Sequence, residues 1–285
     1  MTGSSIPRRA FLLGAGSVAA VACVAPERDL LEPYEDGVLP LEPGTAPPTT
    51  GVPAEGDPTT TLAEDLPPME RLRASVPAED RPGLSFVARV KPDVSEVVVE
   101  ASPGDGVAAF TFANPIASGG DLVFLVEDYD GIGHYRVLLP TRPNGSTGWF
   151  AVDDVALLRH NSAILVELDA FRLTVSDHDD TVLEVPVGVA RDNAPTPRGR
   201  YYTTELLQPP EPDSVYGAYA NGLSGFSEVF TQFRGGPGQL GIHGTNDPGS
   251  IGTNVSAGCI RMRNDDIAAI VEDLKVPTGV PVEVI

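Results

Sequence analysis

Two short stretches decide the fold of the C-terminal half: GIHGTN at residues 241–246 and VSAGCIRM at residues 255–262. Each contains a β-prone apolar run, and a loop rich in Gly, Asn, Asp and Ser separates them. A strand, a loop and a second strand can therefore bring His243 and Cys259 together. A neighbouring imidazole can take the proton of a thiol and return one to a leaving amine. The pattern thus indicates nucleophilic chemistry at a cysteine.

A cysteine and a histidine alone are weak evidence, because a buried thiol and a surface imidazole are the commoner outcome. The longer pattern is more specific. It opens with His-Gly at residues 243–244 and closes with Ser-x-Gly-Cys-x-Arg at residues 256–261. This pattern resembles the catalytic motif of the L,D-transpeptidase (YkuD) family. The resemblance also includes Thr196-Pro197 with Gly199, and it covers about residues 160–285.

The resemblance implies a role for each matching residue. Cys259 would be the nucleophile that forms a thioester, and His243 the general base and then the acid. The carbonyl of Gly244 would orient the imidazole, and backbone N–H groups near Gly258 and Cys259 would hold the oxyanion. Ser256 would support the turn. We expect no cofactor and no metal, since no grouping of His, Cys and Asp has metal-ligand spacing.

Four residues are candidates for substrate binding. Arg261 would bind a substrate carboxylate or brace the loop, and Asn264 would bind substrate or support the site. Tyr216 and Tyr219 lie in the long segment from Leu206 to Gly238, which is either a lid over the site or an extra hairpin. One position departs from the family pattern: many relatives carry His where Ala257 stands, which leaves the choice of acceptor open.

The activity implied by this resemblance is peptidoglycan cross-linking. Cys259 would attack after the third residue of a tetrapeptide stem, release D-alanine, and pass the acyl group to an amine of another stem in a 3→3 link. With water as acceptor the same site is an L,D-carboxypeptidase. Carbapenem-type inhibitors would acylate the cysteine. The rival hypothesis is a non-catalytic lipoprotein that binds the cell wall.

The fold expected is mainly β, in two bodies. In residues 161–285, a catalytic domain, we predict strands from Ile164 onward and one short helix capped by Asn264 with an apolar face through Leu274. Residues 71–160 contain five β-prone runs separated by turn residues and resemble a small SH3-like β-barrel. There Trp149 would fill the barrel or stack a ligand.

The N-terminal residues predict an export signal followed by a linker. Residues 1–23 resemble a signal peptide with paired arginines, either twin-arginine-like or general secretory, and too short an apolar run to span a bilayer. Cys23 ends a lipobox-like sequence, so lipidation there is one expectation and ordinary cleavage the other. Residues 24–70 are rich in Pro and acid and predict a linker. We expect an envelope protein, held to the membrane only by a lipid anchor.

Charge excludes one class of partner. The formal net charge is −21 over 285 residues, and the sequence has no Lys/Arg cluster of the kind that neutralises nucleic-acid phosphates.

We expect the remaining histidines, His134, His160 and His178, to lie on the surface because they show no partner spacing.

Overall fold

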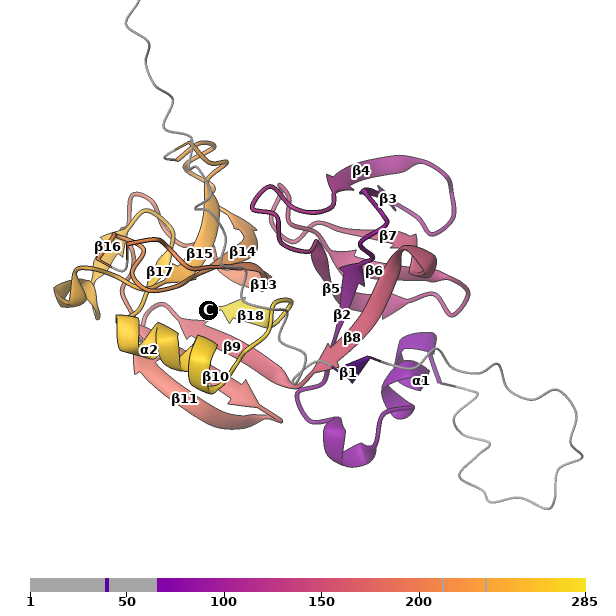
Figure 1. Ribbon diagram of the computed structural model, residues 1–285, viewed down its shortest axis with the longest axis horizontal. Coiled ribbons are helices and arrows are strands. Elements are labelled where there is room, and N and C mark those ends of the chain that lie inside the picture. Colours follow the sequence, from indigo (N-terminus) through magenta and orange to yellow (C-terminus); the bar gives the residue numbers. More distant parts are fainter. Residues whose placement is uncertain (1–38, 41–65, 212, 234) are drawn as a thin grey trace, which may run out of the picture.

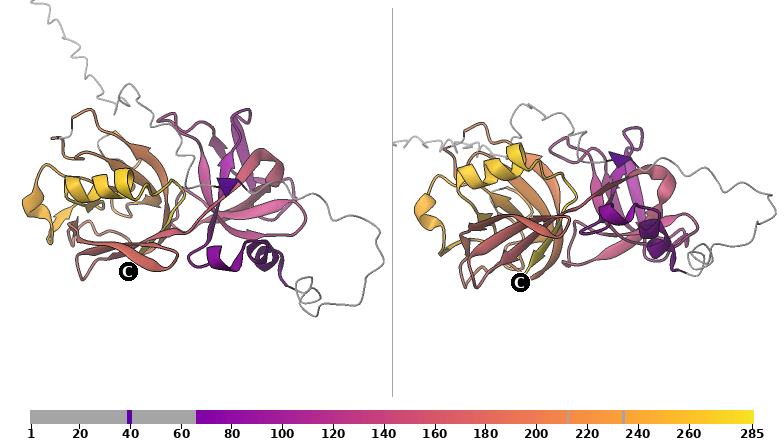
Figure 2. Two further views of the ribbon diagram at one scale, coloured as in Figure 1. Left: turned by 60° about the horizontal axis from the view of Figure 1, so that its bottom comes forward. Right: turned by 90° about the horizontal axis from the view of Figure 1, so that it is seen from below.

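The computed structural model describes residues 39–40, 66–211, 213–233 and 235–285. These residues form two eight-stranded sheets that lie side by side, with a third sheet of two short strands (Figure 1). Figure 2 shows the same separation from two further directions. Helices are few and short, so the prediction of a mainly β protein is confirmed. The signal segment, Cys23 and most of the predicted linker lie outside the described residues.

The first sheet is antiparallel, in the order β1-β8-β2-β5-β6-β7-β3-β4. Its strands are β1 (Leu39–Pro40), β2 (Ser85–Val90), β3 (Glu96–Glu100), β4 (Ala108–Ala113), β5 (Val123–Tyr129), β6 (His134–Leu138), β7 (Thr147–Ala151) and β8 (Val155–His160). All five expected β-prone runs fall on strands. A three-stranded meander, β5 to β7, is followed by a short 3₁₀ turn, and β8 then returns beside β2. The SH3-like assignment of this sheet stays a prediction.

Strands β2 and β5 each contain consecutive buried apolar residues, because both of their faces are covered there. In β2, Phe86 and Ala88 point into the core of the first sheet, where Phe124 and Phe150 also lie. Val87 points the opposite way, as alternation along a strand requires. It joins a separate cluster with Val123, Leu125, Leu138, Leu158 and Tyr202. Tyr202 belongs to the second sheet, so this cluster connects the two bodies.

Tyr202 offers a test of that connection. Its side chain is fully buried, and its hydroxyl has no hydrogen-bond partner among the described residues. Burial raises the pKa of Tyr202 well above its ordinary value. An unpaired buried hydroxyl costs about 1–3 kcal/mol. We therefore expect Tyr202→Phe to raise the free energy of unfolding by about 1 kcal/mol in urea titrations, whereas Tyr202→Ala should lower it by about 3–5 kcal/mol.

The core of the first sheet corrects one sequence expectation. Trp149 does not fill the barrel: Phe150, the next residue, is 1% exposed and lies in the core. Trp149 is only half-buried, and the guanidinium of Arg136 lies 5.9 Å from its ring centroid. The alternation of β7 explains this, because only one of two consecutive side chains can face the core.

A helix that sequence analysis missed lies between β1 and β2. Helix α1 (Pro68–Ala74) begins with a proline at its first turn, where a missing N–H costs nothing. Met69 is buried against the core of the first sheet, with Leu72 beside it. The linker boundary predicted at residue 70 therefore falls inside this helix. A short 3₁₀ turn, Ala78–Asp80, follows it.

The second sheet begins one residue after the first ends, with Asn161 between β8 and β9. Its order is β11-β10-β9-β18-β13-β14-β15-β17. The strands are β9 (Ser162–Glu167), β10 (Arg172–Asp177), β11 (Asp180–Pro186), β13 (Gly199–Leu207), β14 (Ala220–Phe226), β15 (Gln239–His243), β17 (Ile260–Arg261) and β18 (Pro281–Val284). Strands β12 (Val189–Ala190) and β16 (Asn254–Ser256) form the two-stranded sheet, and η3 (Pro248–Ser250) is a 3₁₀ turn.

The long segment from residue 206 to 238 is divided by a strand. Its middle is β14, which pairs antiparallel with both β13 and β15. The hairpin alternative therefore describes residues 199–226. Two loops remain among the described residues: 208–211 and 213–219 before β14, and 227–233 and 235–238 after it.

The predicted C-terminal helix exists but is shorter and differently capped. Helix α2 (Asn264–Ala268) continues as one π-helical turn, Ala269–Asp273, with Ile267 and Ile270 buried as predicted. The N-cap residue is Arg263, not Asn264, and no side chain caps the helix. Asn264 does not cap because its side-chain oxygen accepts hydrogen bonds from two loops instead. No helix among the described residues is long and apolar enough to cross a membrane.

The histidine expectation is wrong for His160. This residue is 4% exposed, and neither ring nitrogen has a well-aligned hydrogen bond within the described part of the chain. His178 is exposed beside Asp177, and His134 is partly buried with Nδ1 2.8 Å from Asp130. His160 ends β8, the last strand before the second body, which is why the fold covers it.

Acid should therefore weaken the fold through His160. Burial lowers the pKa of His160 to about 4, against a smaller opposing effect of the backbone at Gly279 and Ser162 and of Asp177. The unfolded chain takes up this proton near pH 6.5 and the folded chain does not. The free energy of unfolding should fall by about 3 kcal/mol as pH drops from about 6.5 to 4.

Urea unfolding at about pH 7, 6 and 5.5 measures the first part of this decrease, at pH values above the ordinary carboxylate pKa values of about 4. His160→Gln, which does not titrate, should have a shallower dependence than the native protein. Equal slopes for the two proteins would show that His160 is not the source.

Candidate active site

The candidate site lies where β15 and β17 run parallel, beside helix α2 (Figure 1). Ile242 pairs with Ile260 and His243 with Arg261. The two isoleucines are buried in the core of the second sheet. Alternation then places His243, Arg261 and the preceding Cys259 on the opposite face. The pairing thus places His243 on the strand next to the one that follows Cys259, and on the same face of the sheet.

His243 is held in one orientation and one tautomer. Its ring is 5% exposed, and Nδ1 lies 2.6 Å from the carbonyl oxygen of Gly244. A carbonyl only accepts, so Nδ1 carries the proton and Nε2 is left as the basic nitrogen. Burial lowers the pKa of His243 to about 4; the Gly244 hydrogen bond opposes this and the charge of Arg261 adds to it. The imidazole is therefore neutral at pH 7.

Cys259 is a free thiol in a partly covered position. Burial raises the pKa of Cys259, while a hydrogen bond from the backbone of Gly241 and the charge of Arg261 act in the opposite direction. The resting pair is accordingly a neutral thiol and a neutral imidazole. Proton removal from the thiol must then accompany its attack on a substrate.

The turn before Cys259 is fixed by side chains. The Ser256 hydroxyl donates to the Cys259 carbonyl at 2.5 Å and accepts from the Gly258 N–H at 3.1 Å. Thr196 donates to the Gly258 carbonyl at 2.8 Å. Gly258 has φ +131, and an added Cβ would lie 2.9 Å from Leu240, so only glycine fits. Ser256 makes the hydrogen bonds of a residue that supports the turn. The hydrogen bond from Thr196 is an additional support that the sequence did not indicate, although Thr196-Pro197 belongs to the pattern described above.

This turn changes the oxyanion expectation. The Gly258 N–H is already bonded to Ser256, so it does not point into the site as a donor. Of the two backbone donors considered from the sequence, the N–H of Cys259 remains as the candidate.

Asn264 joins two loops around His243. Its side-chain oxygen accepts from the Thr245 N–H at 3.0 Å and from the Ala218 N–H at 3.3 Å. Gly217, at φ +66, packs so closely that an added Cβ would collide with Asn264 and with the Thr245 N–H. This observation supports the loop-bracing role of Asn264, and it adds Gly217, which sequence analysis missed.

The two tyrosines differ in position. The ring of Tyr216 meets the His243 ring edge to face, with centroids 5.1 Å apart. Tyr219 is buried, and its hydroxyl donates to Glu272 at 2.7 Å, on the helical segment after α2. Tyr216 is therefore beside the site, whereas the hydroxyl of Tyr219 serves the packing of the helix.

A polar hollow of about 420 Å³ borders the loop that follows His243. Its walls carry Arg263 together with Asp213 and Asp265, and the loop residues Thr245 and Asn246. Both signs of charge are present, which suits a peptide that carries ammonium and carboxylate groups. Arg263 had no signal in the sequence beyond its place next to the motif. No cluster of three potential metal ligands occurs among the described residues.

Comparison with known proteins shows which family this domain is similar to. Residues 161–284 match the family model of the L,D-transpeptidase catalytic domain, YkuD. That segment of the chain is therefore similar to the L,D-transpeptidase catalytic domain, as its motif suggested.

Particular relatives agree with this assignment. The chain is 35% identical over 121 residues to "Putative L,D-transpeptidase YkuD" of Bacillus licheniformis, a match that covers 42% of this chain and 64% of the relative. It is 34% identical over 136 residues to "Probable L,D-transpeptidase ErfK/SrfK" of Escherichia coli, covering 43% of each protein. The chain thus spans less than two thirds of the length of either relative.

Solved structures of similar proteins include "Structure of the Ldtfm-avibactam carbamoyl enzyme", at 20% identity and a TM-score of 0.34, covering 44% of this chain and 51% of that one. L,D-transpeptidase 3 from Mycobacterium tuberculosis in complex with a faropenem-derived adduct matches at 19% identity and a TM-score of 0.34, over 50% of this chain and 75% of that one.

Proposed function

We propose that this protein is an L,D-transpeptidase that cross-links peptidoglycan stem peptides through a thioester on Cys259. The observation that carries the proposal is the neutral His243, with its proton fixed on Nδ1, on the same sheet face as the free thiol. A base with a free Nε2 is what a neutral thiol needs.

The reaction has two steps. In the first, Nε2 of His243 takes the thiol proton while Sγ of Cys259 attacks the carbonyl carbon of the third stem residue. The C–N bond to D-alanine breaks, and His243 returns the proton to the leaving amine. In the second, an amine of a neighbouring stem attacks the thioester and gives a proton to His243. The new amide is the 3→3 link, and the departing sulfur is reprotonated.

Negative charge on the carbonyl oxygen needs a donor in both steps. The N–H of Cys259 is the donor we propose, held in place by the Ser256 hydroxyl and the Thr196 hydroxyl. The positive charge of Arg261, which favours the thiolate, would also favour this oxyanion. Donor and acceptor peptides would use the polar hollow at Arg263, with Tyr216 covering the imidazole.

The N-terminal part would place this activity in the cell envelope. We propose that residues 1–23 direct export and that Cys23 is the site of a lipid anchor. The meander, 3₁₀ turn and returning strand of residues 85–160 support an SH3-like module between anchor and catalytic domain. Intact-mass analysis of the protein from its envelope, before and after lipase treatment, would test the anchor.

The experiment for the activity uses the full chain with Cys23→Ser, so that Cys259 is its sole thiol. Incubation with a carbapenem should add one molecule of inhibitor, mapped by tandem mass spectrometry to the peptide containing Cys259. In a separate assay without inhibitor, tetrapeptide stems should yield free D-alanine and a cross-linked product. Hydrolysed tripeptide alone would indicate an L,D-carboxypeptidase. No adduct in a folded sample with a free thiol would favour the wall-binding alternative.

A further inference from the structure

The loop of residues 227–233 and 235–238 begins close to the turn that carries the nucleophile. Ser227, which is 3% exposed, opens this loop, and its Cβ lies 4.0 Å from where a Cβ on Gly258 would stand. The Ser227 N–H donates to the Gly238 carbonyl at 2.8 Å and closes the loop at its base. The Ser227 hydroxyl accepts from the N–H groups of Val229 and Phe230. The position of Ser227 therefore bears on the backbone next to Cys259.

This loop is wrapped around an arginine from the other body. Nη2 of Arg142 lies 3.1 Å from the Ser227 carbonyl oxygen, 3.1 Å from that of Phe230 and 2.9 Å from that of Pro237. The guanidinium also lies 4.6 Å from the ring centroid of Phe226. Charged donors make stronger hydrogen bonds than neutral ones, and a planar cation stacks well on an aromatic ring.

Asn144 holds the same strand end from the same barrel loop. Its side chain donates to the Phe226 carbonyl at 2.8 Å and accepts from the Phe226 N–H at 2.8 Å. Arg142 and Asn144 come from the segment between β6 and β7, more than eighty positions before the loop they bind. Together they form a polar clamp, defined here as these two residues and the backbone groups of residues 226–237 that they contact.

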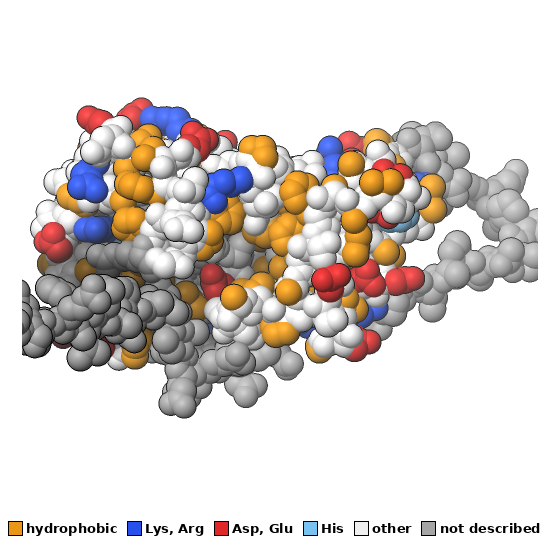
Figure 3. All heavy atoms as spheres, turned by 90° about the horizontal axis from the view of Figure 1, so that it is seen from above, with side chains coloured by type: hydrophobic (Ala, Val, Ile, Leu, Met, Phe, Trp, Pro, Cys, Tyr) orange, Lys and Arg blue, Asp and Glu red, His pale blue; other side chains and the backbone are white. Residues whose placement is uncertain are grey.

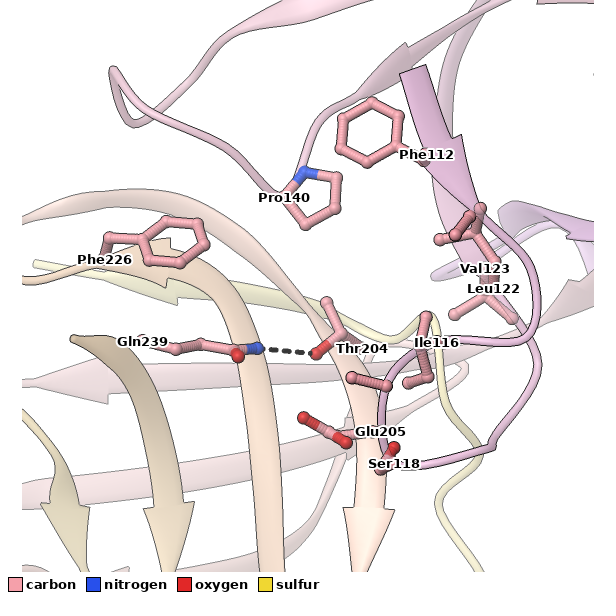
Figure 4. A pocket seen from close by; sticks show the side chains of 12 residues that line it. Phe112, Ile116, Ser118, Leu122, Val123, Pro140, Thr204, Glu205, Phe226 and Gln239 are labelled. Atoms are coloured by element: carbon pink, nitrogen blue, oxygen red, sulfur yellow. Dashed lines mark hydrogen bonds between the residues drawn. The ribbon is translucent and has the colours of Figure 1, made fainter. Parts of the chain in front are cut away.

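The clamp matters because the bodies are incompletely packed beside it. A groove of about 300 Å³ separates them, with Phe112 and Pro140 on one wall and Phe226, Thr204 and Gln239 on the other (Figure 4). The clamp lies beside this groove, because Phe226, which both Arg142 and Asn144 contact, is one of its lining residues. On the face shown in Figure 3, basic side chains of the described residues stand apart from one another among acidic and apolar ones. No broad charged surface in that view would replace the clamp.

We propose that Arg142 is a positioning residue for acyl transfer. By holding the carbonyls of Ser227, Phe230 and Pro237, it fixes Ser227 in the space beside Gly258 and so limits movement of the backbone that carries the N–H of Cys259. The first body would thus influence the rate of acyl transfer and would not serve only as a spacer. This inference rests on the proposed function of Cys259.

The test compares Arg142→Ala, Arg142→Lys and Asn144→Ala with Arg89→Ala, all in the full chain with Cys23→Ser. Arg89 is the control because it lies in the same body and only approaches Asp121, at 4.0 Å on the surface. We expect the acylation rate constant at saturating carbapenem to fall about tenfold in Arg142→Ala, since small displacements of reacting groups have effects of this size. Lysine should restore part of the rate, because its ammonium can donate to the same carbonyls but lacks the planar guanidinium that stacks on Phe226.

Three readouts separate positioning from mere loss of folding. Partial unfolding lowers the labelled fraction, whereas mispositioning lowers the rate constant with the fraction and half-saturating concentration unchanged. Hydrogen exchange of the Val229 and Phe230 amides should accelerate in Arg142→Ala and Asn144→Ala, and stay unchanged in Arg89→Ala. An acylation rate within twofold of the parent in Arg142→Ala, or an equal loss in Arg89→Ala, overturns the proposal.

Failure of the proposed function would be distinguishable. If the parent protein itself is not acylated, the clamp is judged by iodoacetamide labelling of Cys259 and by amide exchange alone. Altered labelling together with faster exchange in the clamp variants would then support positioning of Cys259. Unchanged labelling would overturn it.

Discussion

Cys259→Ala and Cys259→Ser should both abolish covalent acylation by a carbapenem and all release of D-alanine from tetrapeptide stems. Alanine removes the nucleophile, and serine replaces it with a hydroxyl of far higher pKa that a neutral imidazole activates poorly. Neither change should unfold the domain, because Cys259 is partly exposed and its backbone carbonyl keeps the hydrogen bond from Ser256. Intact-mass analysis and D-alanine quantification give the two measurements.

The control for this result is the Ser256→Ala variant, which keeps the thiol and removes two hydrogen bonds of the turn. It should still form an adduct, more slowly. An adduct that persists in Cys259→Ala, in protein that also lacks Cys23, would place the nucleophile elsewhere and refute the mechanism.

His243→Ala should lower the acylation rate by about 10²–10⁴-fold at neutral pH, the usual contribution of a positioned general base. The shape of the pH profile is the more specific result. Since burial lowers the pKa of His243 to about 4 and raises that of the Cys259 thiol, the native pair stays neutral over a wide range. The native rate should therefore be nearly constant between about pH 5 and 8 and fall below about pH 4, where His243 becomes protonated.

The variant should behave differently because it depends on the spontaneous thiolate. Its rate should rise about tenfold per pH unit toward the thiol pKa. Stopped-flow measurement of acylation across this range compares the two proteins, and His178→Ala, at an exposed position away from the site, is the matched control. A native profile that rises with pH as the variant does would show that His243 does not take the proton.

Much of the site was readable from the sequence because its chemistry is local. His243 and Gly244 are neighbours, and Ser256, Gly258 and Cys259 lie within one turn, so their hydrogen bonds depend on short-range geometry. The strands were also predictable, since apolar runs between turn residues mark them regardless of their partners. Residues 161–284 matched the expected family for the same reason.

Other features required the folded chain. The sequence did not show that the Asn264 side chain would accept hydrogen bonds from Thr245 and Ala218, because those partners are 19 and 46 positions away. As a result, no side chain caps the helix. The sequence analysis predicted that His160 lies on the surface. In the structure, His160 is buried at the junction of the two bodies. Helix α1 was missed because its apolar residues are few and its stability comes from packing against the first sheet.

The sequence by itself determined the strand content, the nucleophilic motif and the similarity of residues 161–284 to the L,D-transpeptidase family model, since each depends on contiguous residues. Only the tertiary structure decided which nitrogen of His243 is basic, how burial sets the two pKa values, and that Arg142 reaches the loop beside Cys259. The physical reason is that these properties depend on solvent exclusion and on contacts between segments far apart in the chain, which no local pattern specifies.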